Sequence, residues 1–259
     1  LEGYPQTIQA IQRADLVAFH EQHYGPAGLV IAVVGAVEAG RAIEAVNVAL
    51  GDWSNPRQTL PPALPPTPVL AETVRQQVRI PGKSQADLVL GTTGPSRFAA
   101  DFLAASLGNN ILGQFGMFGR IGEVVREQAG LAYYATSSLG GGIGPGPWLV
   151  SAGVDPGNLE QAIALITGEI DRFTKQPVSH EELADSQANY IGRLPLSLES
   201  NAGVTSALLS LERYALGLDY YRRYPDLVNA VTPEQVLQAA QHYLHPQRLA
   251  IASAGSFET

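Results

Sequence analysis

Residues 110–138, NILGQFGMFGRIGEVVREQAGLAYYATSS, contain three patterns that follow one another. Glycines recur at every third position from Gly113 onward, among apolar and aromatic residues. A short helical pattern comes next, and Gly130 ends it because glycine readily adopts the positive φ that stops a helix. A strand pattern follows. We expect loop, helix and strand to form one unit, with Arg126 in the last helical turn and Tyr133 early in the strand.

The composition predicts a folded, acidic protein. Of the 259 residues, 45% are hydrophobic and 15% are charged, so a sizeable core is expected and disorder is not. The formal net charge of −8 argues against nucleic acid or an anionic membrane surface as the main partner. The sequence has no cysteine, and no apolar run reaches the roughly 18 residues of a membrane span.

Before this unit, apolar spacing predicts one or two helices over Thr7–Tyr24 and another over Val37–Leu50. Between them, the apolar run Leu29–Val34 is typical of a buried strand. Residues 55–68 are rich in proline, which removes hydrogen-bond donors and favours an extended backbone. We therefore interpret this stretch as a linker.

After the linker, the patterns predict an alternation of strands and helices. Strands are expected near 72–80, 85–91 and 148–154, and helices over 98–112, from 158 to 173, over 199–216 and twice more before a last strand that ends at 255. Ser179 and Glu182 have the spacing of a capping box at the start of a further helix. We expect that helix to reach Arg193 and to be broken by Pro195.

The end of the chain is similar to its beginning at an offset of 220 residues without gaps. Identical pairs include Tyr4 and Tyr224, Pro5 and Pro225, Pro26 and Pro246, Leu29 and Leu249, Ile31 and Ile251, and Gly35 and Gly255. Self-similarity at a fixed offset is typical of duplicated modules. We interpret residues 1–58 as the tail of a preceding homologous module, 59–69 as a proline-rich linker and 70–259 as a complete module.

The segment Arg126–Tyr133 reads R-E-Q-A-G-L-A-Y and resembles the R-E-x-x-G-L-A-Y mark of the second half of pitrilysin/insulinase-type zinc peptidases, the family that includes the mitochondrial processing peptidases. The segments Ile111–Phe115 and Leu194–Glu199 are similar to that family too. The resemblance covers essentially the whole chain. Gly119–Gly122 departs from it, because the family often has Ser-Arg-Leu-Phe there.

This resemblance implies an α+β fold: a two-layer module with a mixed, largely antiparallel sheet covered by helices, as in LuxS and the mitochondrial processing peptidases. It also implies that a first module carries the zinc on an inverted motif, H-x-x-E-H with a downstream glutamate, whereas the second module has no metal. We therefore expect no cofactor in this chain and zinc in a partner module.

The five histidines do not form a zinc motif. H-x-x-E-H places two histidines four residues apart on one helical face, with the glutamate activating water. The pairs His20/His23 and His242/His245 are only three residues apart. At the 220-residue offset His20 aligns with Ala240 and His23 with Tyr243, and a metal ligand is not expected to change so freely between repeats. We interpret these histidines as helix-surface or packing residues.

Arg126 and Tyr133 are the candidate catalytic residues. An arginine presents a fork of donors to carbonyl or carboxylate oxygens, and a tyrosine hydroxyl can donate to an oxyanion. The resemblance implies that both reach the metal site of the other module, where they orient the substrate and stabilise the transition state. The alternative is structural: a cation at a helix C-terminus and a tyrosine packed in a sheet. Strand alternation places Tyr134 on the opposite sheet face, so we interpret it as structural.

Gly113, Gln114, Phe115 and Gly116 form the candidate substrate-binding loop, where glycine would leave room for an extended peptide. Close packing of neighbouring elements is the alternative explanation for these glycines. The loop lacks the order of glycines and the lysine of phosphate-binding motifs. The pair Glu181-Glu182 is typical of a solvated helix start.

Two functions fit these observations. In the first, the chain closes over a catalytic zinc-binding module, in cis or in trans, and binds a peptide substrate through Arg126 and Tyr133. In the second, it is a non-catalytic scaffold or peptide-binding subunit of the same family. Neither requires nucleic acid or a membrane span, and the compartment stays open between cytoplasm and periplasm. We expect the chain by itself to hydrolyse nothing.

Overall fold

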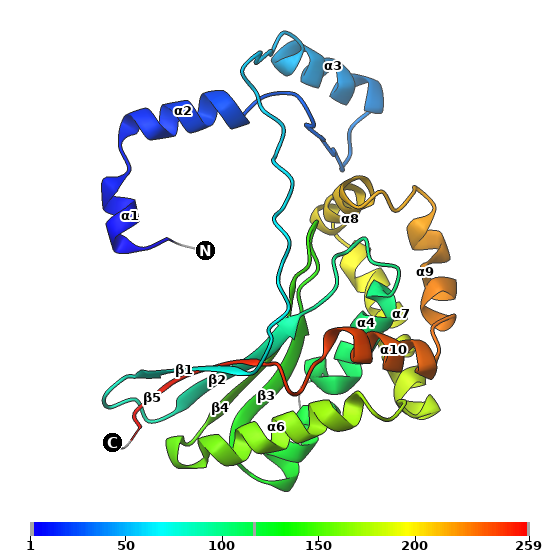
Figure 1. Cartoon of the computed structure of the whole chain (residues 1–259). Coiled ribbons are helices and arrows are strands. Elements are labelled where there is room, and N and C mark those ends of the chain that lie inside the picture. Colours follow the sequence, from blue (N-terminus) through cyan, green and yellow to red (C-terminus); the bar gives the residue numbers. More distant parts are fainter. Residues whose placement is uncertain (1–2, 116–117, 258–259) are drawn as a thin grey trace. The chain divides into compact units, whose positions relative to one another are not determined.

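The computed structural model describes residues 3–115 and 118–257 and divides into two compact units (Figure 1). The larger unit comprises Pro66–Leu196 and Leu216–Thr259, and the smaller unit comprises Leu1–Pro65 and Ser197–Ala215. This division groups residues 197–215 with the N-terminal residues, which the sequence does not anticipate. The predicted module boundaries at residues 58 and 70 stay predictions.

The larger unit is built on one five-stranded sheet. Its strands are β1 (Val74–Arg79), β2 (Ala86–Thr93), β3 (Ala132–Leu139), β4 (Pro147–Val154) and β5 (Ala250–Gly255), in the spatial order β1-β5-β2-β4-β3. β1 pairs with β5 in parallel, and the other three pairs are antiparallel. This sheet confirms the prediction of a mixed, largely antiparallel arrangement. β5 is an interior strand although it comes last in the sequence.

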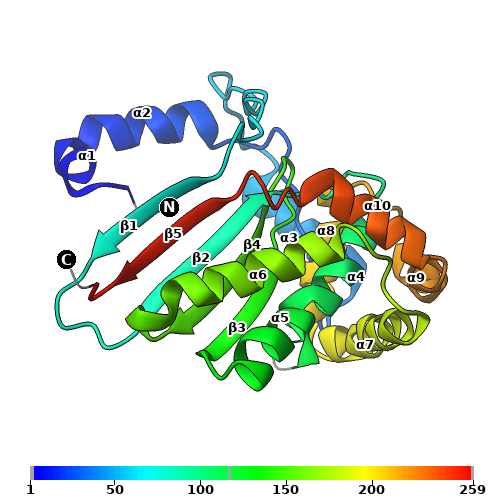
Figure 2. The same ribbon diagram turned by 60° about the horizontal axis from the view of Figure 1, so that its bottom comes forward.

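Helices cover one face of this sheet, as Figure 2 shows for α6. The helical elements are α4 (Phe102–Asn109), the π-helix η1 (Asn110–Gln114), α5 (Arg120–Gly122), the π-helix η3 (Glu123–Gln128), the 3-10 turn η4 (Pro156–Asn158), α6 (Leu159–Phe173), α7 (His180–Leu198), α9 (Tyr220–Asn229) and α10 (Pro233–Tyr243). One buried cluster joins strand residues such as Leu88 and Val150 to Leu107 in α4 and Ile166 in α6. The predicted α+β class is confirmed.

The prediction that Pro195 breaks a helix is wrong, because α7 continues through it to Leu198. Proline lacks one N–H and therefore removes one intrahelical hydrogen bond. Only three residues of α7 follow Pro195, so the helix loses little. The capping box that starts this helix is confirmed: Ser179 N donates to Glu182 Oε2 over 2.8 Å, and Glu182 N donates to Ser179 Oγ over 3.1 Å.

The smaller unit contains α1 (Pro5–Ala10), α2 (Arg13–His23), α3 (Ala39–Leu50) and α8 (Asn201–Arg213). None of the first three helices has a buried residue. The predicted strand Leu29–Val34 is not formed in the structure, although the segment is apolar. A strand needs a partner for its backbone ladder, and no described residue pairs with this one. In the described residues, no helix has the length and apolar character to cross a bilayer.

Candidate functional site

In the glycine-rich loop, the backbone at Gly113 lies very close to the backbone of β3 at Ser137. A Cβ atom added to Gly113, in η1, would lie 2.7 Å from the backbone nitrogen of Ser137 in β3. One added to Gly119 would lie 2.6 Å from the Cα atom of Gly113. Contacts this short leave no room for a side chain. These two glycines therefore allow neighbouring elements to pack closely, which is the alternative to peptide binding that the sequence analysis gives for the loop. Gly113 itself is buried.

A chain of buried polar groups holds Gln114 at the end of η1. Trp148 Nε1 donates to Ser137 Oγ over 3.3 Å, and Ser137 Oγ donates to Asn109 Oδ1 over 2.5 Å. Asn109 Nδ2 then donates to Gln114 Oε1 over 3.3 Å. The Tyr190 hydroxyl, on α7, lies 3.2 Å from the same Gln114 oxygen and 3.1 Å from the carbonyl oxygen of Ser106. Burial raises the pKa of Tyr190, so its hydroxyl stays protonated and able to donate.

These contacts orient the amide of Gln114. Its oxygen faces Asn109 and Tyr190, and no residue in the described part of the chain accepts a hydrogen bond from its Nε2. The side chain is exposed, so this nitrogen is a donor available to a bound molecule. Phe115 is exposed beside it and lines a cavity of about 130 Å³. Gly116, the fourth predicted loop residue, lies outside the described residues.

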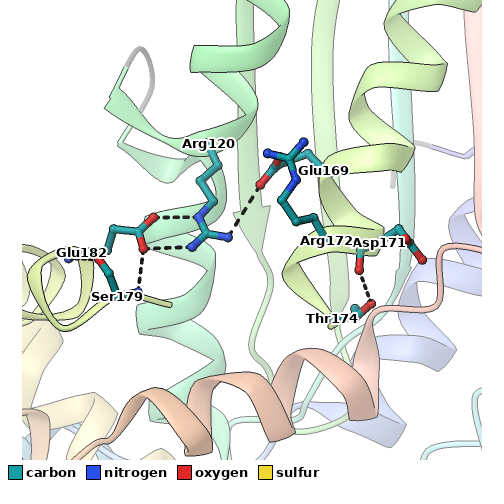
Figure 3. A network of polar contacts seen from close by, with 7 residues as sticks. All are labelled: Arg120, Glu169, Asp171, Arg172, Thr174, Ser179 and Glu182. Atoms are coloured by element: carbon teal, nitrogen blue, oxygen red, sulfur yellow. Dashed lines mark hydrogen bonds and ion pairs between the residues drawn. The ribbon is translucent and has the colours of Figure 1, made fainter. Parts of the chain in front are cut away.

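Arg120 fixes the other end of the loop, as Figure 3 shows. Its Nε donates to Glu182 Oε1 over 2.7 Å and its Nη2 to Glu182 Oε2 over 2.9 Å. Its Nη1 lies 3.7 Å from Glu169 Oε1 on α6, and Arg172 Nη1 lies 3.1 Å from Glu169 Oε2. The Arg120 guanidinium also lies over the ring of Phe173, 5.3 Å from its centroid. One side chain thus ties the loop to both α6 and α7.

Arg120 and Glu182 stabilise each other's charge. The hydrogen bonds from Arg120 lower the pKa of Glu182 to about 2, and the hydrogen bond to Glu182 raises the pKa of Arg120. Glu169 is only 2% exposed, and its burial raises its pKa although two arginines oppose that shift. The carboxylate pair at the start of α7 is therefore not simply solvated: Glu182 is the anchor of Arg120.

Arg126 lies in the last turn of η3, where the sequence predicts it. Gly130 adopts φ +65°, and its backbone N–H donates to the carbonyl oxygen of Arg126 over 3.0 Å. This is the bond of a helix that ends in a left-handed glycine, so the predicted stop is confirmed. The Arg126 side chain is 35% exposed, and its Nε lies 3.6 Å from the carboxylate of the adjacent Glu127.

Tyr133 is the extra residue of a β-bulge. Ala132 lies opposite Val154 and Tyr134 lies opposite Gly153, so Tyr133 has no partner on β4. Bulges redirect a side chain and are frequent next to active sites. The Tyr133 side chain is 80% exposed, and its hydroxyl makes no hydrogen bond within the described residues. No hydrogen bond or cation–π contact joins Tyr133 to Arg126.

A β-bulge interrupts the strand pairing beside Tyr134, and the prediction that Tyr134 lies on the opposite sheet face from Tyr133 stays a prediction. Tyr134 lies over Gly153: a Cβ added to that glycine would lie 2.6 Å from the Tyr134 ring. The two tyrosines therefore differ in environment. Tyr134 has a packing partner in the sheet, whereas Tyr133 extends into solvent.

Sequence reasoning missed the residues that position the loop, which are Asn109, Arg120, Glu182 and Tyr190. Their partners lie far along the chain, up to 84 residues for Tyr190 and Ser106. The sequence indicated one of these residues only, through the capping-box spacing of Ser179 and Glu182. That spacing places the Glu182 carboxylate at the start of α7 but does not show that it also binds Arg120. In the described residues, no group of three or more His, Cys, Asp or Glu side chains could hold a metal ion.

The fold and the glycine-stopped R-E-x-x-G-L-A-Y turn define a module of the pitrilysin/insulinase type, and the described residues do not fit a zinc ion. The chain matches the family described as Peptidase M16 inactive domain over residues 10–190, which is more than half of its length, and it belongs to that family. The resemblance stated from the sequence is thereby confirmed.

Known proteins agree with this assignment. The chain is 26% identical to an uncharacterized zinc protease of Streptomyces coelicolor over 217 residues, 80% of this chain and 45% of that protein. It is 26% identical to one of Mycobacterium leprae over 264 residues, 98% of this chain and 57% of that protein. The crystal structure of a peptidase M16 inactive domain from Pseudomonas fluorescens is 27% identical, with a TM-score of 0.88 over 100% of this chain and 60% of that chain. The chain thus spans about half the length of the curated relatives it matches.

Proposed function

We propose that this chain is the metal-free half of a zinc peptidase, closing over a zinc-binding catalytic module and holding a peptide through Arg126 and Tyr133. The observation that supports it most is the state of Tyr133. A bulge removes this residue from the ladder and leaves its phenol 80% exposed. A tyrosine with that environment contributes little to the folded core, so a role in binding explains it better than packing does.

The two side chains supply complementary donors. The Tyr133 hydroxyl donates to the peptide carbonyl oxygen as negative charge develops on it, which stabilises the transition state more than the ground state. The Arg126 guanidinium binds a neighbouring carbonyl or a carboxylate through two N–H groups. Zinc in the partner module would activate the attacking water.

Gln114 extends this set of donors. Its amide oxygen is held by Asn109 and Tyr190, so Nε2 is presented in a fixed direction and loses little conformational freedom on binding. An extended peptide offers a carbonyl oxygen at every residue, and each needs a donor when water is excluded. The substrate class that fits is an unfolded or extended peptide, recognised through its backbone.

The competing explanation for Arg126 is favourable charge at a helix end, worth about 0.3–1 kcal/mol. Its ion pair with Glu127 at 3.6 Å is partly exposed and adds little. Neither effect accounts for Tyr133, which has no ionic role. The peptide-binding proposal accounts for both residues.

The test uses the purified chain and the zinc-binding module encoded in the same or a neighbouring reading frame. A fluorogenic peptide should be stable with the chain alone in the presence of zinc, and it should be cleaved when both parts are combined. Chelator-sensitive cleavage by the 259 residues alone would contradict the proposal. Peptide binding without cleavage by the combined parts would favour the scaffold function.

A further inference from the structure

The cavity beside Phe115 has walls from two parts of the chain. Asn110, Phe115 and Phe118 line it from η1 and the glycine-rich loop, and Glu182 and Asp185 line it from the first turns of α7. Its volume is about 130 Å³. Pockets for drug-sized molecules commonly measure about 300–1,000 Å³, so this one suits the end of a single side chain.

One wall of the cavity carries a buried polar atom that lacks a partner. Asn110 is 1% exposed, and its Oδ1 makes no hydrogen bond with the part of the chain that the structure describes. Native proteins rarely leave a buried carbonyl oxygen unpaired. The Ser186 hydroxyl, in the same wall, already donates to the carbonyl oxygen of Leu107 over 3.2 Å. Both side chains therefore offer acceptors, and a donor that enters the cavity would satisfy Asn110.

The charge that remains in the cavity is negative. Arg120 lines it too, but its guanidinium donates two hydrogen bonds to Glu182, as Figure 3 shows, so these two charges offset each other. Asp185 lies three residues after Glu182 on α7, is exposed and forms no ion pair with any described residue. Its carboxylate is therefore available to a cation.

The remaining part of the wall is aromatic. Phe115 and Phe118 are both exposed, and the backbone N–H of Phe118 donates to the carbonyl oxygen of Phe115 across the turn. The face of a phenyl ring attracts a cation, and apolar rings also cover the alkyl stem of a long basic side chain. Acceptors, one available carboxylate and two rings together favour an occupant that is both cationic and apolar along its length.

We propose that this cavity binds a basic side chain of the peptide substrate, of which lysine is the simplest case. Its ammonium group donates to Asn110 Oδ1 and pairs with Asp185, and its stem lies against the two rings. An acidic side chain would be repelled by Asp185, and a purely apolar one would leave Asn110 Oδ1 unpaired. The inference rests on the proposed peptide-binding function, and it adds a preference for one kind of side chain.

The position of the cavity agrees with this preference. Phe115 directly follows Gln114, whose Nε2 is the donor available to a peptide backbone. Successive side chains of an extended peptide point in opposite directions. A peptide whose carbonyl oxygen binds Gln114 thus presents a side chain next to the mouth of the cavity. The backbone contacts do not select a sequence, whereas the cavity selects one residue.

The test uses the chain combined with its zinc-binding module and pairs of fluorogenic peptides. Each pair carries a single lysine, or its uncharged analogue norleucine, at the same position, and that position is moved along the peptide. At one position lysine should raise kcat/KM at least about tenfold over norleucine, because a charge-assisted hydrogen bond is gained. Asp185→Asn should reduce that ratio to below about threefold. Asp226→Asn is the matched control, since Asp226 is also exposed on a helix, in α9, and should leave the ratio unchanged.

The outcomes separate this inference from the function on which it rests. Equal cleavage of lysine and norleucine peptides at every position would overturn the inference and leave the proposed function intact. A lysine preference that survives Asp185→Asn would lie in the zinc-binding module and would overturn the inference as well. If the combined protein cleaves none of the peptides, the proposed function fails and the inference fails with it.

Discussion

Arg120 donates two parallel hydrogen bonds to Glu182, 2.7 Å from Nε to Oε1 and 2.9 Å from Nη2 to Oε2. The two residues are 62 positions apart in the chain. This contact joins the end of the glycine-rich loop to the first turn of α7. Since a bidentate pair of this kind fixes orientation as well as distance, it holds the loop in one position relative to the helices.

The first prediction concerns how much the Arg120–Glu182 pair stabilises the fold. Arg120→Ala removes both hydrogen bonds and leaves Glu169 with Arg172 as its remaining ionic partner, so we expect the free energy of unfolding to fall by roughly 1.5–3 kcal/mol. Arg75→Ala is the matched control, because Arg75 makes two bonds to the exposed Glu160. Its cost should be below about 1 kcal/mol. Urea denaturation measures both, and equal losses would show that Arg120 is an ordinary surface cation.

The second prediction concerns pH. The folded-state pKa of Glu182 is about 2, below its ordinary value of 4.5, so its contribution is present above about pH 4.5 and is lost as the pH falls towards 2. The pKa of Glu169 is raised instead, so protonation of this residue at low pH stabilises the folded protein relative to the unfolded chain. Glu182→Gln should therefore flatten the fall in unfolding free energy between pH 5 and pH 3. The same slope in both proteins would refute the assigned pKa.

The third prediction concerns the loop glycines. Gly113→Ala places a methyl group against the Ser137 backbone and should destabilise the fold by about 1–3 kcal/mol. Gly168→Ala in α6 is the control, because a Cβ there meets nothing within 4 Å. Removing a helical glycine should stabilise by about 0.5–1 kcal/mol. Thermal unfolding of both variants shows whether each one is more or less stable than the unsubstituted protein. An unchanged stability of Gly113→Ala would contradict the close approach of Gly113 to the Ser137 backbone.

Local chemistry made part of this structure predictable. The stop at Gly130 depends only on one residue that tolerates positive φ, so the sequence indicates it and with it the place of Arg126. The capping box of Ser179 and Glu182 is similarly local. The alternation of apolar and polar residues over 72–80 predicts β1, whereas the mixed sheet follows from the family resemblance rather than from any pattern in the sequence.

Contacts between distant residues were not predictable. The bulge at Tyr133 depends on how β3 pairs with β4, which the alternation of one strand does not reveal. The role of Glu182 depends on Arg120, and the orientation of Gln114 depends on Asn109 and Tyr190. Leu29–Val34 has the composition of a strand, yet composition does not supply the neighbours that a strand requires.

The fourth prediction separates Arg126 from its ion pair with Glu127. In the protein combined with its zinc-binding module, Arg126→Ala should lower peptide turnover at least about tenfold, because a charged donor to the substrate is lost. Glu127→Gln is the matched control, since it removes the partner at 3.6 Å and leaves the donor in place. The two variants should unfold at similar urea concentrations. A loss with Glu127→Gln as large as that with Arg126→Ala would indicate a structural ion pair instead.

Turnover by Tyr133→Phe, measured in the same combined protein, tests the central claim most directly. The substitution removes one hydroxyl that makes no hydrogen bond within the described chain, so folding should be unaffected. We predict that turnover falls at least about tenfold, since a donor to the developing oxyanion is lost. Tyr134→Phe, one residue along β3, should leave turnover unchanged. Equal turnover by Tyr133→Phe and the unsubstituted protein would contradict the account.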